Sequence, residues 1–153
     1  MPTQLKPNVV EDALVQALTQ ALPNVNVAAL TERDVSEEGT LIVTPPAVLV
    51  MFDSETLVST RDVTATTYQG SQRHLIICGA RDLGSPGAER GAAKQLVSDV
   101  RNALAGLRLN LPDDGMSTMP TVIAGVERFQ FDKNGTWYAV LADVQAIAQF
   151  TPK

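Results

Sequence analysis

Residues Val122–Phe150, VIAGVERFQFDKNGTWYAVLADVQAIAQF, decide the class of fold. Two apolar runs, Val122–Phe131 and Trp137–Phe150, flank Asn134-Gly135, and Asn-Gly is the strongest short-range signal for a β-hairpin. The apolar residues of the second run that share one face are Tyr138, Val140, Ala142, Val144, Ala146, Ala148 and Phe150, with Asp143, Gln145 and Gln149 on the other. This alternation predicts antiparallel sheet with one buried face and one wet face.

Upstream of this hairpin the sequence predicts further strands. Arg73–Arg81 (RHLIICGAR) is apolar on both faces, which indicates a strand inside the sheet. Pro46–Phe52 is a proline-led apolar strand, and Pro45-Pro46 must lie at a strand end or edge because proline cannot donate to a ladder. Asp53–Gln72 has high β-propensity but little burial pattern, so we expect a protruding hairpin or a long arm, with a mobile loop as the alternative.

Two amphipathic helices complete the pattern. Asn8 is the expected N-cap of the first, with Glu11 reaching back to it, and apolar residues recur at helical spacing to Ala21. Ser85-Pro86 is the expected start of the second. Its expected buried stripe is Ala92, Leu96, Val100, Ala103, Leu104 and Leu107. We therefore predict one α+β domain over residues 1–153: a mainly antiparallel sheet with a long C-terminal hairpin, packed by two amphipathic helices.

Composition narrows the class of function. Hydrophobic residues make up 44% and charged residues 19%, which predicts a globular core and not a disordered chain. No apolar run approaches the roughly 20 residues of a bilayer helix, and Met1–Lys6 is followed by no signal-peptide pattern. The net charge of −5 disfavours tight binding to a phosphate backbone. A single cysteine excludes an internal disulfide and a cysteine-rich zinc site.

The strand–loop–helix around Gly79–Gly91 is the most tempting motif for chemistry, because a glycine loop before a helix can bind phosphate. The spacing fits neither a dinucleotide fingerprint nor a P-loop, and Glu89 in the first helical turn would repel an anion. Turn formation and close helix–sheet packing explain these glycines better. A small phosphate- or nucleotide-binding domain using this loop stays as the rival interpretation.

Catalytic and metal chemistry find less support. His74 and Cys78, each the only one of its kind, lie four residues apart on a predicted strand, hence about 13 Å apart and beyond hydrogen-bond reach. We expect Cys78 to be a buried small hydrophobe and His74 to lie at a strand end or on the surface. Asp113-Asp114-Gly115 reads as a turn and not as a calcium loop. We thus expect no catalytic residue, no cofactor and no metal, and a protein that works through its surfaces.

Four stretches, in this order, carry a resemblance to a known family. They are Val9–Leu14 running into Leu22-Pro23, Pro45–Val50, Ala80–Leu83 followed by Gly91-Ala92-Ala93, and the C-terminal apolar hairpin strand. In order and spacing the chain resembles the tail terminator proteins of Mu-like contractile-tailed bacteriophages, from about Val9 to Phe150.

The resemblance implies a structural virion protein without enzymatic activity. It implies a homohexameric ring that caps the tail tube, stops tube polymerisation and joins the tail to the head–neck connector, and that also meets the sheath. Such a ring is assembled in the host cytoplasm and resides at the tail–neck junction of the virion, where DNA passes through its lumen without specific binding and no membrane is involved. Another neck or tail-completion protein would share this coarse pattern, and a regulatory or toxin–antitoxin partner protein would form dimers instead.

A ring needs contacts between subunits, and pairing of exposed strand edges is a standard route to them. We expect the Asp53–Gln72 arm to supply such contacts. Arg61, Tyr68 and Arg73, in or beside this arm, are the candidate interface residues.

Overall fold

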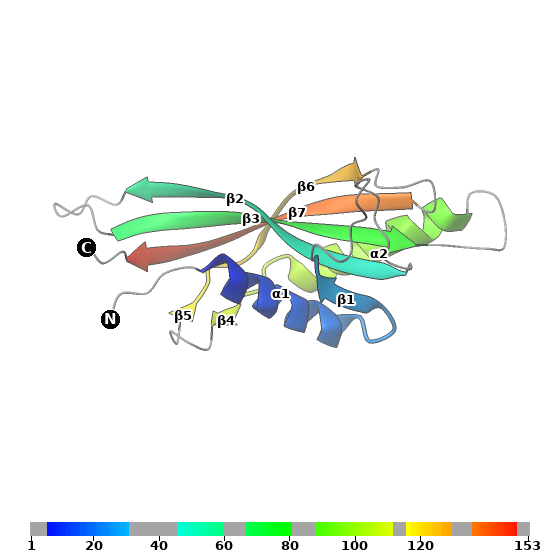
Figure 1. Ribbon diagram of the computed structural model, residues 1–153, viewed down its shortest axis with the longest axis horizontal. Coiled ribbons are helices and arrows are strands. Elements are labelled where there is room, and N and C mark those ends of the chain that lie inside the picture. Colours follow the sequence, from blue (N-terminus) through cyan, green and yellow to red (C-terminus); the bar gives the residue numbers. More distant parts are fainter. Residues whose placement is uncertain are drawn as a thin grey trace.

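The C-terminal hairpin forms one side of a five-stranded sheet in the computed structural model, which describes residues 6–30, 46–59, 67–80, 88–111, 116–129 and 136–149 (Figure 1). The strand order is β1-β2-β3-β7-β6, with β1 parallel to β2 and every other pair antiparallel. The strands are β1 (Asn26–Ala29), β2 (Ala47–Ser59), β3 (Thr67–Ala80), β6 (Val122–Phe129) and β7 (Thr136–Gln149). The predicted α+β class and its mainly antiparallel sheet are confirmed.

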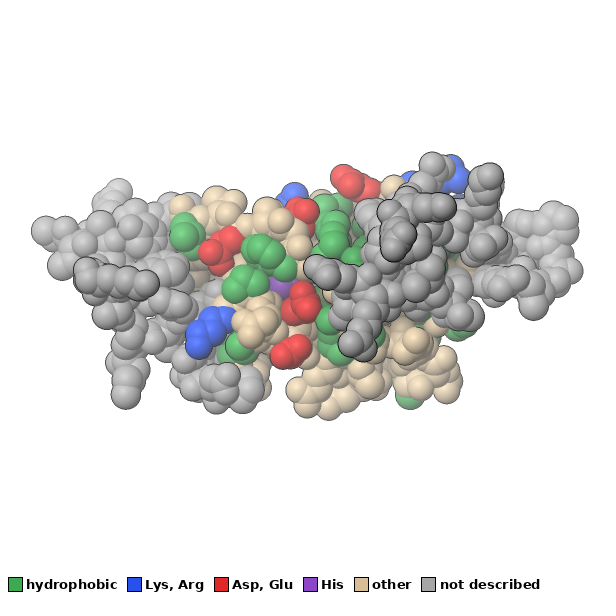
Figure 2. Space-filling model, viewed as in Figure 1, with side chains coloured by type: hydrophobic (Ala, Val, Ile, Leu, Met, Phe, Trp, Pro, Cys, Tyr) green, Lys and Arg blue, Asp and Glu red, His purple; other side chains and the backbone are tan. Residues whose placement is uncertain are grey.

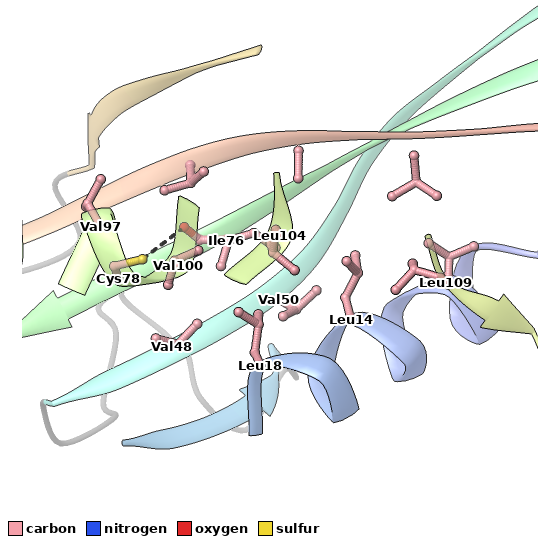
Figure 3. Close-up of a cluster of buried hydrophobic side chains, with 14 of the residues drawn as sticks. Leu14, Leu18, Val48, Val50, Ile76, Cys78, Val97, Val100, Leu104 and Leu109 are labelled. Atoms are coloured by element: carbon pink, nitrogen blue, oxygen red, sulfur yellow. Dashed lines mark hydrogen bonds between the residues drawn. The ribbon is translucent and has the colours of Figure 1, made fainter. Parts of the chain in front are cut away.

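Two helices, α1 (Pro7–Ala21) and α2 (Ala88–Leu104), pack on one face of this sheet. Their inward residues join alternate residues of the central strands in one core, drawn in Figure 3. The buried members of this core include Val10, Leu14, Leu18, Val48, Val50, Ile76, Cys78, Leu96, Val97, Val100, Leu104, Val140, Ala142 and Val144. The interior position predicted for Arg73–Arg81 is correct for its described part, since β3 lies at the centre of the sheet.

The opposite face of the sheet has a smaller core that the alternation did not predict. Trp137 and Ala139 of β7 are buried there, together with Ala47, Leu49 and Ile77. The face of β7 expected to be wet is therefore buried at its first residues. Farther along, Asp143 and Gln145 on that face are partly exposed, as the alternation predicts.

Two helix details correct the sequence prediction. Lys6, not Asn8, is the N-cap of α1, and it makes no side-chain cap hydrogen bond. Pro7 occupies the first helical turn because its fixed φ suits the helix and its missing N–H would have no partner there. In α2 the predicted stripe is confirmed at Leu96, Val100 and Leu104, which are buried, but it begins at buried Ala93 and not at Ala92, which is exposed. The predicted start at Ser85-Pro86 and the turns at Asn134-Gly135 and Asp113-Asp114-Gly115 lie outside the described residues.

Hydrogen bonds join the chain after α2 to the segment before β6. Gly106 takes φ +77°, a left-handed conformation that favours glycine and ends the helix. Thr121 then binds Leu107 with both its hydroxyl and its backbone N–H, which donate to the Leu107 carbonyl at 2.8 and 2.9 Å. A short two-stranded ladder, β4 (Asn110–Leu111) and β5 (Met116–Ser117), lies between these segments in sequence.

Candidate assembly surfaces

The Asp53–Gln72 region, expected to be an arm or a loop, contains the far halves of β2 and β3. These halves pair in register as far as Ser59 with Tyr68, and β7 continues beside β3 as far as Thr67 with Gln149. In Figure 1 the three strands run together past the helices, toward the left of the view. Residues 60–66, between β2 and β3, lie outside the described part. The hairpin is therefore the outer part of a three-stranded ribbon.

Of the three candidate interface residues, Arg73 is the one whose side chain is described. Its guanidinium donates to both carboxylate oxygens of Asp143 on the neighbouring β7, at 2.9 and 3.1 Å, and its side chain is 40% exposed. This pairing raises the pKa of Arg73, first through the hydrogen bond and then through the charge of Asp143. The backbone of Tyr68 pairs with Ser59 and Ala148, and Arg61 lies outside the described residues. Their role in an interface stays a prediction.

His74 corrects an expectation, because it is fully buried in β3 and not at a strand end or on the surface. It shares the helix-facing side of the strand with Gln72, and its Nε2 lies 3.2 Å from Gln72 Oε1. The Gln72 amide nitrogen donates to Glu55 at 2.7 Å, so its oxygen is the acceptor and His74 must donate through Nε2–H. Phe52 lies edge-on to the imidazole at 5.6 Å between ring centroids.

This environment keeps His74 neutral. Burial lowers its pKa from 6.5 to about 4, because a charged imidazolium would lose its hydration. The Nδ1 atom is buried and has no hydrogen-bond partner among the described residues. A neutral histidine with one bonded nitrogen tolerates this position, whereas a protonated one would leave a second buried donor unpaired.

Cys78 is buried as predicted, on the same face of β3. Burial raises the pKa of its thiol to about 12, and the thiol donates to the Ile76 carbonyl at 3.5 Å (Figure 3). A thiol held in its protonated form is a poor nucleophile. Within the described residues no three His, Cys, Asp or Glu side chains gather as metal ligands, and no described helix is long and apolar enough to cross a bilayer.

Gly79, at the start of the glycine loop, lies within the described residues. Gly79 pairs with Trp137 across β3 and β7, and the indole ring occupies the space that a Cβ at Gly79 would need. Packing therefore explains this glycine, although the tryptophan lies on a neighbouring strand and not on the helix that was expected. Residues 81–87 of the loop lie outside the described part.

Sequence reasoning missed a groove between α2 and β6, with a volume of about 270 Å³. Val97, Val126 and Tyr138 supply its apolar lining, and Lys94, Ser98 and Arg101 of α2 supply its polar lining. Helical spacing of the α2 residues was visible in the sequence. That β6 lies beside that helix follows only from the tertiary fold.

The sheet has two edges that no described strand covers. β6 pairs only with β7, so its outer edge is open over the described residues. β1 pairs with β2 only up to Val50, and the Phe52 backbone beyond it hydrogen-bonds with Glu11 of α1. From Asp53 to Ser59 the outer edge of β2 pairs with no described strand. Both edges have exposed apolar side chains, Val122 (50%) and Val126 (37%) on β6 and Leu57 (43%) on β2. Unpaired edges with exposed apolar residues are typical contact sites for other chains.

Comparison with known proteins identifies no family. No protein-family model matches the chain, and no curated protein is similar enough to match. One solved structure, of a protein without a functional name, aligns with 97% of this chain and 99% of its own, at 18% identity and a TM-score of 0.43. A chain from the virion of a native gene transfer agent particle aligns with 80% of this chain and 99% of its own, at 14% identity and a TM-score of 0.27. Both TM-scores are too low for either likeness to carry a conclusion about fold or function.

Proposed function

We propose that the chain is a structural virion protein of a bacteriophage tail, a tail terminator that acts by assembling into a ring and not by catalysis. The observation that carries this proposal is the open outer edge of β2, with exposed Leu57, on a ribbon that runs past the helices (Figure 1). A free edge of this kind pairs readily with another chain, and repeated pairing between copies generates a ring when the rotation closes.

The proposed partners follow from the sequence resemblance. Copies of the chain form a homohexamer, which binds the last ring of tail tube subunits on one side and the head–neck connector on the other, with the sheath alongside. DNA passes through the lumen, and the net charge of −5 is compatible with passage without tight binding. The buried imidazole and thiol support a role without catalysis, because neither group is presented to a substrate.

Light scattering on the purified chain over a range of concentrations tests this proposal first. A ring of six copies has a mass of about 98 kDa, six times the 16.3 kDa of one chain. We expect this species to grow with concentration, and negative-stain images of it to show closed rings. A dimer that stays the largest species at every concentration would support a regulatory partner protein instead.

A second measurement separates this proposal from the phosphate-binding rival. Thermal unfolding is followed with and without ATP, GTP or NAD, each in large excess. A ligand that binds only the folded state raises the midpoint, by about 2.7 kcal/mol of stabilisation at one hundred times its Kd. We expect no shift, and a clear shift with one nucleotide would contradict the structural role.

A further inference from the structure

We infer that the groove between α2 and β6 receives the acidic outer edge of β2, residues Asp53–Leu57, from a second copy of this chain. The inference rests on the proposed function and adds to it the two surfaces that meet. It follows from the open edges, from the charges beside them and from the face of the sheet on which those charges lie.

The receiving surface is cationic with an apolar floor. Lys94 and Arg101 are exposed, lie seven residues apart on α2 and so project from the same side of the helix above Val126. Arg128 of β6 is exposed and pairs with Tyr138, so it shares the helix-facing side of the sheet with the groove.

The described acidic side chains closest in sequence to these cations do not lie on the groove side. Asp99 projects from a different side of α2, where Gln95 donates to it at 3.0 Å. Glu127 pairs with Ala139 of the opposite core, so its side chain lies on the other face of the sheet. The groove thus selects an occupant with negative charge.

The donor surface is acidic with an apolar residue at its centre. Asp53, Glu55 and Leu57 are exposed along the part of β2 that has no described strand on its outer side. Glu55 pairs with Gln72, which shares the helix-facing side of β3 with His74, so Glu55 and Leu57 lie on that side too. Figure 2 shows acidic and hydrophobic side chains around the position of the histidine on the face of the molecule in view.

The two surfaces match in face as well as in charge. When two sheets join edge to edge their faces become continuous, and in the inferred orientation the helix-facing side of one copy continues the helix-facing side of the next. Glu55 and Leu57 of one copy then reach the groove of the other, where Leu57 contacts Val126 and Glu55 approaches Lys94 and Arg101. The bulge between Ile123 and Gly125 interrupts the β6 ladder, which leaves the run Gly125–Phe129 for regular pairing.

Cysteine cross-linking in trans tests the inference on the intact chain. A Leu57→Cys chain is mixed with a Val126→Cys chain and oxidised mildly, and the rate of disulfide formation between them is measured. Native Cys78 stays out of the reaction because it is buried and its thiol pKa is about 12. The control pairs Leu57→Cys with Met119→Cys, a position that is slightly more exposed than Val126 (44% against 37%) but outside the groove lining. We expect the groove pair to form at least about tenfold faster, as about 1.4 kcal/mol of preferential association gives.

Charge reversal then tests the recognition itself. Lys94→Glu with Arg101→Glu in the receiving chain is expected to remove the advantage, and Asp53→Lys with Glu55→Lys in the donor chain to restore it. All four positions are exposed, and circular dichroism checks that each variant is folded. Equal rates for the groove pair and the Met119 pair, or an advantage that survives charge reversal, would overturn the inference.

The outcomes separate this inference from the proposed function. Hexameric rings without preferential cross-linking at the groove would leave the terminator proposal standing on another interface. Preferential cross-linking in a protein that assembles only into open filaments would support the groove interface and contradict the closed ring.

Discussion

The neutral, buried His74 predicts a specific loss of stability in mild acid. The chain has one histidine, which ordinarily titrates near pH 6.5 and in the folded state near pH 4, because burial disfavours the charged form. Between these two values the unfolded chain binds a proton that the folded chain does not. The free energy of unfolding is therefore unaffected by His74 above pH 6.5 and falls as the pH drops toward 4.

The magnitude follows from the two pKa values. A full difference between 6.5 and about 4 corresponds to about 3 kcal/mol, and between pH 7.5 and pH 5 the loss is about 2 kcal/mol. Such a loss is a large part of the roughly 5–15 kcal/mol that stabilises an ordinary domain.

Urea unfolding at pH 7.5 and at pH 5 measures this loss, with His74→Gln as the comparison. Glutamine can still donate to Gln72 Oε1 but does not titrate, so the variant keeps the carboxylate contributions and loses only that of the imidazole. We expect the wild-type midpoint to fall between these pH values by about 1 M urea more than that of the variant. A difference in unfolding midpoint between the two proteins that is the same at both pH values reflects packing. It does not affect the comparison of their pH dependence.

The same imidazole gives a direct spectroscopic check, because the chain has one histidine and its Cε1 proton signal in the NMR spectrum therefore belongs to His74. In the folded protein this signal should keep its neutral position down to about pH 5. A folded-state titration near pH 6.5, or urea curves that move in parallel for wild type and variant, would refute the claim that His74 is sealed from water.

Three further results are expected from the packing. Gly79→Ala should destabilise the protein by about 1–3 kcal/mol in urea, because the new Cβ collides with the Trp137 ring, whereas Gly125→Ala meets only an ordinary contact and should unfold nearly like wild type. Gly106→Ala should cost about 1 kcal/mol in the same assay through its positive φ, since no atom of the described residues lies near the new methyl group, and a neutral result would show that the turn relaxes. The Cys78 thiol should react with a thiol reagent only at the rate of unfolding, and rapid labelling of native protein would contradict its burial.

The sheet was predictable where one strand carries its own pattern. The alternation of Tyr138–Ala146 gave the buried face of β7 correctly, since a period of two places every second residue on one side. The two-faced apolar run of β3 likewise predicted a central strand. The N-cap of α1 was predicted two residues too late, because Asn8 can cap a helix with its side chain, whereas the helix begins at Pro7 after Lys6, which makes no such bond.

What the sequence could not supply was the pairing between distant segments. His74 packs against Phe52 and lies beside Gln72 in its buried position. The position of Phe52 depends on the register of β2 against β3. Gly79 was correctly assigned to packing, but its partner Trp137 is known only from the β3–β7 register. The groove beside Val126 needs the position of α2 over β6 and leaves no local signal at all.

The charges at the two open edges also bear on how copies of the chain would associate. An edge strand that pairs with any other strand leads to aggregation, and bulges and charged side chains are the usual protection. Here β2 is interrupted by the bulge at Asp53 and β6 by the bulge at Ala124, and their charges differ in sign on the helix-facing side. Two β2 edges would place carboxylates together, and two β6 edges would place cations together. Only unlike edges attract, so the inferred pairing is head-to-tail, and a head-to-tail contact produces a ring or an open chain and never a closed two-fold dimer.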